Sequence, residues 1–198
     1  FIAGGSGMVG SSLQKTLINA GYGDAKFGGK LIAPSRKELN LLNFNDVSCW
    51  YETFKPSVVI IAAGKVGGIN ANANFPADFI LENLKIQTNV IENSWKNNVK
   101  RFIFLGSSCI YPKFAEQPIK ESYLLSGKLE QTNEPYAISK IAGIKLCASL
   151  KFQYGFEAIS FMPTNLYGPN DNYHPQNSHV LPALISKFHK AKMTNKKK

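Results

Sequence analysis

A glycine-rich turn directly after a short apolar run limits the possible folds of this chain more than any other feature. Residues 4–10 read GGSGMVG and lead into a segment of helical periodicity, Met8–Ala20. In this spacing Gly4 permits a tight turn, Gly7 lets a pyrophosphate approach the backbone, and Gly10 lets the helix pack closely on the strand. The anion then lies at the helix N-terminus. The motif predicts a strand-turn-helix unit that binds a dinucleotide, and a purely structural turn is the alternative.

The rest of the chain alternates between short apolar runs and longer segments of helical periodicity. This alternation predicts right-handed crossovers and a parallel sheet with helices on both faces, which is the α/β, doubly wound Rossmann fold. The stretch 111–133 shows neither the alternation of a strand nor the periodicity of a helix, and it is expected to be irregular. The expected strands are Phe1–Ala3, Lys30–Ala33, Ser57–Ala63, Arg101–Ser107 and Glu157–Met162, and the expected helices are Met8–Ala20, Phe44–Lys55, Pro76–Asn97, Pro135–Tyr154 and Val180–Lys192.

Composition and charge exclude several classes of protein. The 198 residues, 44% of them hydrophobic, have the size of one globular domain, and no apolar run approaches the roughly 18 residues that span a bilayer. The net charge is +10, but six of the 23 basic residues lie in the last dozen positions, without an aromatic pattern typical of single-strand binding. We therefore expect a soluble protein with a solvated lysine tail and neither nucleic-acid nor membrane partners.

The cysteines indicate the compartment. Cys49, Cys109 and Cys147 form an odd set without the spacing of metal ligands, and no signal segment is present. The sequence therefore predicts a reducing, cytoplasmic location and no metal site.

The residues after the second expected strand indicate which dinucleotide binds. In NAD-binding versions of the fold an acidic residue near this point accepts the ribose 2′-hydroxyl. Here Pro34 is followed by Ser35, Arg36 and Lys37. A guanidinium binds a phosphate through two parallel hydrogen bonds, so Arg36 is expected to bind the 2′-phosphate of NADP(H). The alternative is an ordinary surface arginine, and the nearby Glu38 leaves NAD open.

A tyrosine and a lysine lie four residues apart on an expected helix. This spacing places Tyr136 and Lys140 on one helix face. The lysine ammonium is expected to lower the pKa of the phenol, and Ser107, at the end of the fourth strand, to complete a hydrogen-bond path to a carbonyl oxygen. Ser108 competes with Ser107 for this role. Together with the glycine turn, the set predicts hydride transfer between carbonyl and alcohol, and a solvated helix face is the alternative.

A second acid/base pair is available beside this set. Cys109 lies two residues after Ser107, and His179 opens the last expected helix. A thiolate can remove a proton from the carbon next to a ketone, and an imidazolium can return one to the opposite face. Such a pair can invert a stereocentre. The alternatives are a packed cysteine and a surface or capping histidine.

A family resemblance is carried by four longer blocks, Lys65–Ile69, Leu105–Pro112, Asn133–Gly143 and Met162–Pro169. Together with the glycine turn they are similar to the extended short-chain dehydrogenase/reductases that act on nucleotide sugars, and more narrowly to the GDP-L-fucose synthase family of 3,5-epimerase/4-reductases. The likeness covers nearly the whole chain and implies NADP(H), a GDP-sugar substrate and a homodimer.

The resemblance also implies roles for individual residues. Cys109 is implied as the base and His179 as the acid that epimerise C3 and C5 of GDP-4-keto-6-deoxymannose, before Ser107, Tyr136 and Lys140 support reduction at C4. Lys187 is implied as a contact of the substrate diphosphate, with an exposed lysine as the alternative. The implied cofactor-binding residues are Gly4, Gly7, Met8, Val9, Gly10, Arg36, Leu105, Gly106, Ser107, Lys140, Pro163, Thr164, Asn165, Leu166 and His179.

Members of this family continue beyond the point where this sequence stops. The expected organisation is therefore an NADP-binding Rossmann domain over residues 1–175 and the start of a substrate-binding region over residues 176–198, truncated before the C-terminal substrate domain. One alternative function is a nucleotide-sugar 4-epimerase or 4,6-dehydratase with tightly bound NAD, against which Arg36 and Cys109 argue. Another is a catalytically incompetent fragment that binds cofactor.

Overall fold

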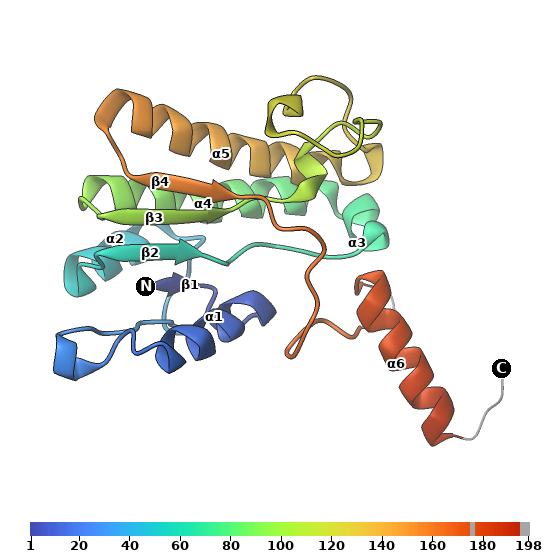
Figure 1. The fold of residues 1–198 in the computed structure, drawn as a ribbon, viewed down its shortest axis with the longest axis horizontal. Helices are drawn as coiled ribbons and strands as arrows, with labels where there is room; N and C mark the ends of the chain where they lie inside the picture. Colours follow the sequence, from blue (N-terminus) through green and yellow to red (C-terminus); the bar gives the residue numbers. More distant parts are fainter. Residues whose placement is uncertain (175–176, 195–198) are drawn as a thin grey trace.

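A four-stranded parallel sheet forms the centre of the protein. The computed structural model describes residues 1–174 and 177–194. Its strands lie in the order β1-β2-β3-β4 and comprise Ile2–Ala3, Val58–Ile61, Arg101–Leu105 and Ala158–Phe161. The α-helices are α1 (Met8–Asn19), α2 (Phe44–Phe54), α3 (Ile69–Asn74), α4 (Pro76–Lys96), α5 (Glu134–Tyr154) and α6 (Val180–Met193) (Figure 1). The predicted α/β class and parallel sheet are confirmed.

The interior of the sheet follows the alternation of the strand residues. Val59 and Ile61 of β2 lie beside Phe102 and Phe104 of β3 in register, and all four are buried. Each strand enters the sheet in the same direction, so the carboxyl ends of all four strands meet at one edge. Polar residues that follow these strands are therefore brought together, as the ligand sites of open α/β sheets require.

The strand predicted at Lys30–Ala33 does not form. A single backbone hydrogen bond, from Ile2 N–H to Ile32 O at 2.8 Å, joins this extended segment to β1. The ladder stops there because the next hydrogen bond would come from the N–H of residue 34, and Pro34 has no N–H to donate. The segment nevertheless lies on the side of β1 opposite β2, since β2 bonds to the carbonyls of Phe1 and Ala3. The next two segments of the chain that pair with β1 thus lie on opposite sides of it, which creates a topological switch point.

The five predicted helices form, each with one end that differs by a single residue. A sixth, α3, was not predicted because its sequence INANAN is short and lacks apolar periodicity. It begins after Gly68, and the amide of Asn72 donates hydrogen bonds to the carbonyls of Gly67 and Gly68 at 2.8 and 3.1 Å. The stretch 111–133 is largely irregular, as predicted, but contains the 3₁₀ turns η3 (Glu121–Tyr123) and η4 (Gln131–Asn133).

Helices α4 and α5 pack side by side against the sheet (Figure 1). A Cβ on Gly143 of α5 would collide with the ring of Phe104, so glycine permits the close approach of α5 to β3. The side-chain amide of Gln87 on α4 donates to the carbonyl of Ser139 at 2.5 Å. The N-terminal half of α5, which carries the predicted tyrosine and lysine, is therefore held from both sides.

Helix α6 projects away from the sheet (Figure 1). It begins next to α3, where the carbonyl of Asn177 accepts a hydrogen bond from Gly68 N–H at 3.1 Å. The end of the predicted lysine tail, Lys196–Lys198, lies outside the described residues. None of the helices described here combines the length and the apolar character needed to cross a membrane.

Candidate active site

The glycine turn has the geometry of an anion site. Gly4 has a φ of +88°, and a Cβ there would lie 2.6 Å from the backbone nitrogen of Ala63 at the end of β2. A Cβ on Gly10 would overlap the carbonyl of Gly4, so α1 crosses the turn as closely as predicted. At Gly7, the residue before α1, a Cβ would meet only the Gly4 oxygen, at 3.5 Å. The open space at the start of a helix without acidic residues in its first turn fits a pyrophosphate.

The segment after β4, the strand at the opposite edge of the sheet from β1, extends to this glycine turn. The amide of Asn170 donates to the hydroxyl of Ser11 in α1 at 3.0 Å. Residues 163–166, which the sequence predicts to contact the cofactor, lie between the end of β4 and this tether, and Thr164, Asn165 and Leu166 are exposed. The structure therefore places this stretch along the carboxyl edge of the sheet (Figure 1).

Arg36 lies in the turn that follows the extended segment beside β1. Its neighbour Glu38 accepts a hydrogen bond from Ser35 N–H at 2.7 Å, and this bond lowers the pKa of the carboxyl group. The carboxylate is thus engaged by its own turn, whereas Arg36 is exposed. This arrangement favours an arginine contact over an acidic one at the ribose.

Ser107, Tyr136 and Lys140 come together at the carboxyl end of β3. Ser107 follows the strand, Tyr136 lies in the first turn of α5, and Lys140 lies one turn further along the helix. The ammonium of Lys140 donates to the carbonyl of Leu105 at 3.0 Å and lies 5.9 Å from the centroid of the Tyr136 ring. The hydroxyl of Ser107 is near enough to the phenol to influence the pKa of Tyr136. The predicted cluster is therefore present in the structure.

The electrostatics of this cluster differ from the sequence expectation. Burial, reinforced by negative charge at Cys109, raises the pKa of Tyr136 to about 12, although the hydrogen bond from Ser107 acts in the opposite direction. Burial also lowers the pKa of Lys140 to about 8. The expected acidification of the phenol by the ammonium is therefore wrong for the protein without cofactor, because burial is the dominant influence on the pKa of Tyr136. The phenol is protonated at neutral pH and is a proton donor.

Cys109 lies beside this cluster, in the 3₁₀ turn η2 (Ser108–Ile110). Its backbone N–H donates to the Ser107 hydroxyl oxygen at 3.3 Å, and its half-buried sulfur accepts a hydrogen bond from the amide of Asn133 at 3.2 Å. Sequence reasoning missed Asn133, because an asparagine before a helix is usually a capping residue. Only its place within the block Asn133–Gly143 could have drawn attention to it.

The other two predicted residues lie on α6. His179 is the residue before the helix and Lys187 lies two turns further along it, and both side chains are exposed. The carbonyl of Asn177 accepts a hydrogen bond from Gly68 N–H, and the adjacent Gly67 lies close to Phe79. The ring of Phe79 in turn meets that of Tyr136 edge-on at 6.3 Å. The structure thus brings Ser107, Cys109, Tyr136 and Lys140 together and leaves His179 and Lys187 on a separate helix.

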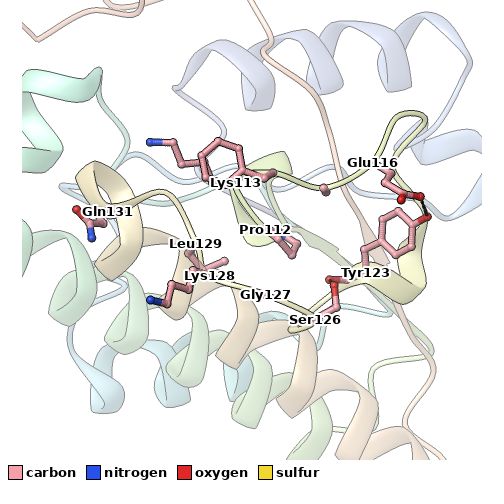
Figure 2. Close-up of a pocket in the computed structure, with 11 residues that line it drawn as sticks. Pro112, Lys113, Glu116, Tyr123, Ser126, Gly127, Lys128, Leu129 and Gln131 are labelled. Atoms are coloured by element: carbon pink, nitrogen blue, oxygen red, sulfur yellow. Dashed lines mark hydrogen bonds between the residues drawn. The ribbon is translucent and has the colours of Figure 1, made fainter.

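A cavity of about 740 Å³ lies within the irregular stretch between η2 and α5. Figure 2 shows its lining side chains, with the hydroxyl of Tyr123 directed toward Glu116 and the two lysines, Lys113 and Lys128, at its edges. It contains none of the clustered residues, so we place the chemistry at the carboxyl end of β3 instead. One of its lining residues, Gln131, belongs to η4, the turn that also carries Asn133.

Comparisons with known proteins agree with this geometry. The chain is 55% identical over 193 residues to "GDP-L-fucose synthase 1" of Arabidopsis thaliana, covering 98% of this chain and 58% of that protein. It is 53% identical over 195 residues to the "GDP-L-fucose synthase" of Escherichia coli strain K12, covering 98% and 59%. The chain therefore spans a little under three fifths of the length of these curated relatives.

Solved structures share the fold over nearly the whole chain. A GDP-L-fucose synthetase from Naegleria fowleri bound to NADP matches with a TM-score of 0.86 at 27% identity, covering 98% of this chain and 58% of that one. A GDP-D-glycero-L-gluco-heptose synthase from Campylobacter jejuni, solved in the presence of NADPH, matches with a TM-score of 0.89 at 42% identity, covering 97% and 54%. The family model of NAD dependent epimerases and dehydratases matches residues 1–197. With its glycine turn and its Ser107, Tyr136 and Lys140 cluster, the chain belongs to the NAD dependent epimerase/dehydratase family.

Proposed function

We propose that the protein is a GDP-L-fucose synthase, which converts GDP-4-keto-6-deoxymannose to GDP-L-fucose by epimerisation at C3 and C5 and NADPH-dependent reduction at C4. The observation that carries the proposal is the cluster at the end of β3, where a protonated phenol and a thiol belong to residues that both lie beside Ser107. A simple reductase needs the phenol but has no use for the thiol. The identity of 53–55% to GDP-L-fucose synthases supports the substrate.

The residues of the chain fit NADP(H). The open space at Gly7 suits the pyrophosphate, and the exposed Arg36 suits the 2′-phosphate. Lys140 uses one of its three N–H donors on the Leu105 carbonyl, which leaves two for the ribose hydroxyls. When bound, the cofactor supplies the hydride. The remaining expected contacts, residues 163–166, belong to the same proposal.

The epimerisation uses the acidity of protons next to the ketone. Ser107 and Tyr136 donate hydrogen bonds to the C4 oxygen and stabilise the enolate that develops there. The Cys109 thiolate takes the proton from C3 or C5 and becomes a thiol, while the C–H electron pair moves into the enolate. His179, which lies before the separate helix α6, is proposed to act as imidazolium, return a proton to the opposite face and become neutral. Exchange with solvent then restores both groups.

The reduction uses the same oxygen. As hydride reaches C4, the phenol of Tyr136 gives its proton to the alkoxide, for which a pKa of about 12 keeps it in the required protonated form. The ammonium of Lys140, 5.9 Å from the ring centroid, stabilises the phenolate that remains. Lys187 is proposed to hold the diphosphate of the substrate.

The direct test is the stoichiometry of the reaction. The full-length protein is incubated with NADPH and GDP-4-keto-6-deoxymannose, and the product is compared with authentic GDP-L-fucose by chromatography. We expect one NADPH oxidised per GDP-L-fucose formed. A 4-epimerase or 4,6-dehydratase, which returns the hydride it removes, would turn over without net NADPH consumption. Binding of NADPH without any turnover would indicate a cofactor-binding protein and overturn the proposal.

Arg36→Ala is expected to weaken NADPH binding about 10- to 100-fold, because the 2′-phosphate loses a charge-assisted partner. Binding of NADH should change little. The matched control is Lys37→Ala, which removes an exposed cation from the next position. Fluorescence titration with both cofactors measures the ratio. An equal loss for NADPH and NADH in Arg36→Ala would contradict the assignment.

The reduction rate is expected to fall as pH rises above about 8, because burial lowers the pKa of Lys140 to about 8 and the neutral amine no longer stabilises the phenolate. The stability of the fold is expected to increase over the same pH range. Between about 8 and the ordinary value of 10.5 the unfolded chain binds a proton that the folded chain has lost, so the free energy of unfolding rises with pH. The pH dependence of the reduction rate and of the free energy of unfolding, the latter from urea titrations, is measured for the parent and for Lys140→Met. If either pH dependence persists in Lys140→Met, the ionisation of Lys140 is not its cause.

Three expectations complete the proposal. We propose a cytoplasmic homodimer that pairs the faces of α4 and α5, where Leu81 and Ile138 are exposed. We further propose that the chain divides into a cofactor domain over residues 1–175 and the start of a substrate-binding region from residue 176. The projecting position of α6 supports this division (Figure 1).

A further inference from the structure

We infer that Asn133 is a positioning residue for Cys109, and that its side-chain amide holds the sulfur in place and stabilises its thiolate form. This inference rests on the proposed function, in which Cys109 is the base. It assigns a role to a residue outside the predicted catalytic set. The amide acts only through Cys109 and is not proposed to touch the reacting atoms.

The position of Asn133 in the chain makes its side-chain contact unusual. It is the residue before α5, where asparagine normally accepts hydrogen bonds from the first N–H groups of the helix. Asn43, in the same position before α2, does this and accepts from Asn45 and Asp46 at 2.9 and 3.4 Å. Asn133 makes no such bond, and its amide instead donates to Cys109 Sγ at 3.2 Å. The Asn133 side chain therefore binds the sulfur and does not cap the helix.

The start of α5 tolerates this loss. Pro135 stands in the first turn of the helix and has no N–H, so one of the groups that a cap would satisfy is missing. The Oδ1 atom of Asn133 is buried and has no hydrogen-bond partner among the described residues. The position of the Asn133 side chain is therefore explained by the hydrogen bond from its N–H to Cys109 Sγ, and not by any contact of its oxygen.

The contact joins two segments that are far apart in sequence. Asn133 ends η4 and Cys109 lies in η2, so the bond closes the base of the loop of residues 110–132. On its other side the cysteine is fixed by its backbone bond to the Ser107 hydroxyl. Two bonds thus set the direction of the thiol relative to the oxygen that Ser107 and Tyr136 are proposed to hold.

The amide also favours one ionisation state of the sulfur. An N–H donor stabilises a thiolate, and hydrogen bonds to a charged partner are about twice as strong as neutral ones. The nearby phenol is protonated at neutral pH. Removing the amide is therefore expected to reduce both the proportion of thiolate and its alignment.

Three variants test the inference, all made with Cys49→Ser so that the exposed second thiol does not react. Asn133→Ala removes the donor. Asn133→Asp keeps the shape and caps helices as well as asparagine does, but places a carboxylate against the sulfur. Gln131→Ala, two residues earlier in the same η4 turn, is the matched control. The full-length proteins are loaded with NADP⁺, and solvent deuterium uptake at C3 and C5 of the keto sugar is followed by NMR.

Asn133→Ala is expected to slow deuterium uptake about 10- to 100-fold, and Asn133→Asp at least as much, while Gln131→Ala keeps the parent rate. Alkylation of Cys109 by iodoacetamide should slow in the same order. Reduction of a 4-keto sugar that needs no epimerisation should stay near the parent rate.

Two results would overturn the inference. If Asn133→Asp restores the parent rates, the residue is a helix cap. If folded Asn133→Ala exchanges and alkylates like the parent, the amide has no effect on the thiol. Should the parent itself take up no deuterium, the proposed function fails, and the alkylation rates still decide whether Asn133 controls the thiol.

Discussion

Tyr136→Phe is expected to lower the rate of NADPH-dependent ketone reduction by roughly 10²- to 10⁴-fold, the contribution of a well-placed general acid. The variant keeps the ring that meets Phe79 edge-on and loses only the hydroxyl. The C4 alkoxide then has no protonated phenol from which to take its proton. Binding of NADPH should be unchanged, since the expected cofactor contacts of the glycine turn and Lys140 remain.

The control for this prediction is Tyr123→Phe, which removes a phenol hydroxyl from the cavity between η2 and α5. It should reduce the ketone at the parent rate. Stopped-flow measurement of NADPH oxidation at saturating substrate gives the rate of both variants. If Tyr136→Phe retains near-parent turnover, the proton comes from another group and the role proposed for the phenol is wrong.

Cys109→Ser is expected to abolish solvent deuterium uptake at C3 and C5, with a loss of roughly 10²- to 10⁴-fold. A serine hydroxyl is ionised far less than a thiol at neutral pH, so it is a poor base in the same position. The Ser107 and Tyr136 contacts of the ketone remain. A 4-keto sugar that needs no epimerisation should therefore still be reduced, which separates this variant from Tyr136→Phe.

Cys49→Ser is the matched control for the thiol, because Cys49 is exposed on α2. It should exchange deuterium like the parent. Continued uptake at both carbons in Cys109→Ser would place the base elsewhere. Loss at only one carbon would show that a second group removes the other proton, and the single-base mechanism would have to be abandoned.

The sequence predicted the elements whose residues carry their own local signal. The glycine turn was correct because Gly4 and Gly10 have no room for a Cβ. Tyr136 and Lys140 share a helix face because four residues make about one turn. Ser107 was placed by the rule that parallel strands end at one edge of the sheet.

What the sequence could not predict depends on contacts between distant segments. The strand at Lys30–Ala33 does not form because Pro34 has no N–H for the next bond of the ladder to β1. The contact of Asn133 with Cys109 crosses 24 positions of the chain, and nothing in either segment alone indicates it. The predicted direction of the pKa shift of Tyr136 was wrong because burial, which the sequence does not report, raises this pKa.

The central claim is that one oxygen, held by Ser107 and Tyr136, serves both epimerisation and reduction. It is tested most directly by running the reaction of the full-length protein in D₂O with unlabelled NADPH and locating deuterium in the product by NMR. We predict GDP-L-fucose with deuterium at C3 and C5 and hydrogen from NADPH at C4. Deuterium at C4, or a reduced product with hydrogen retained at C3 and C5, would contradict the claim.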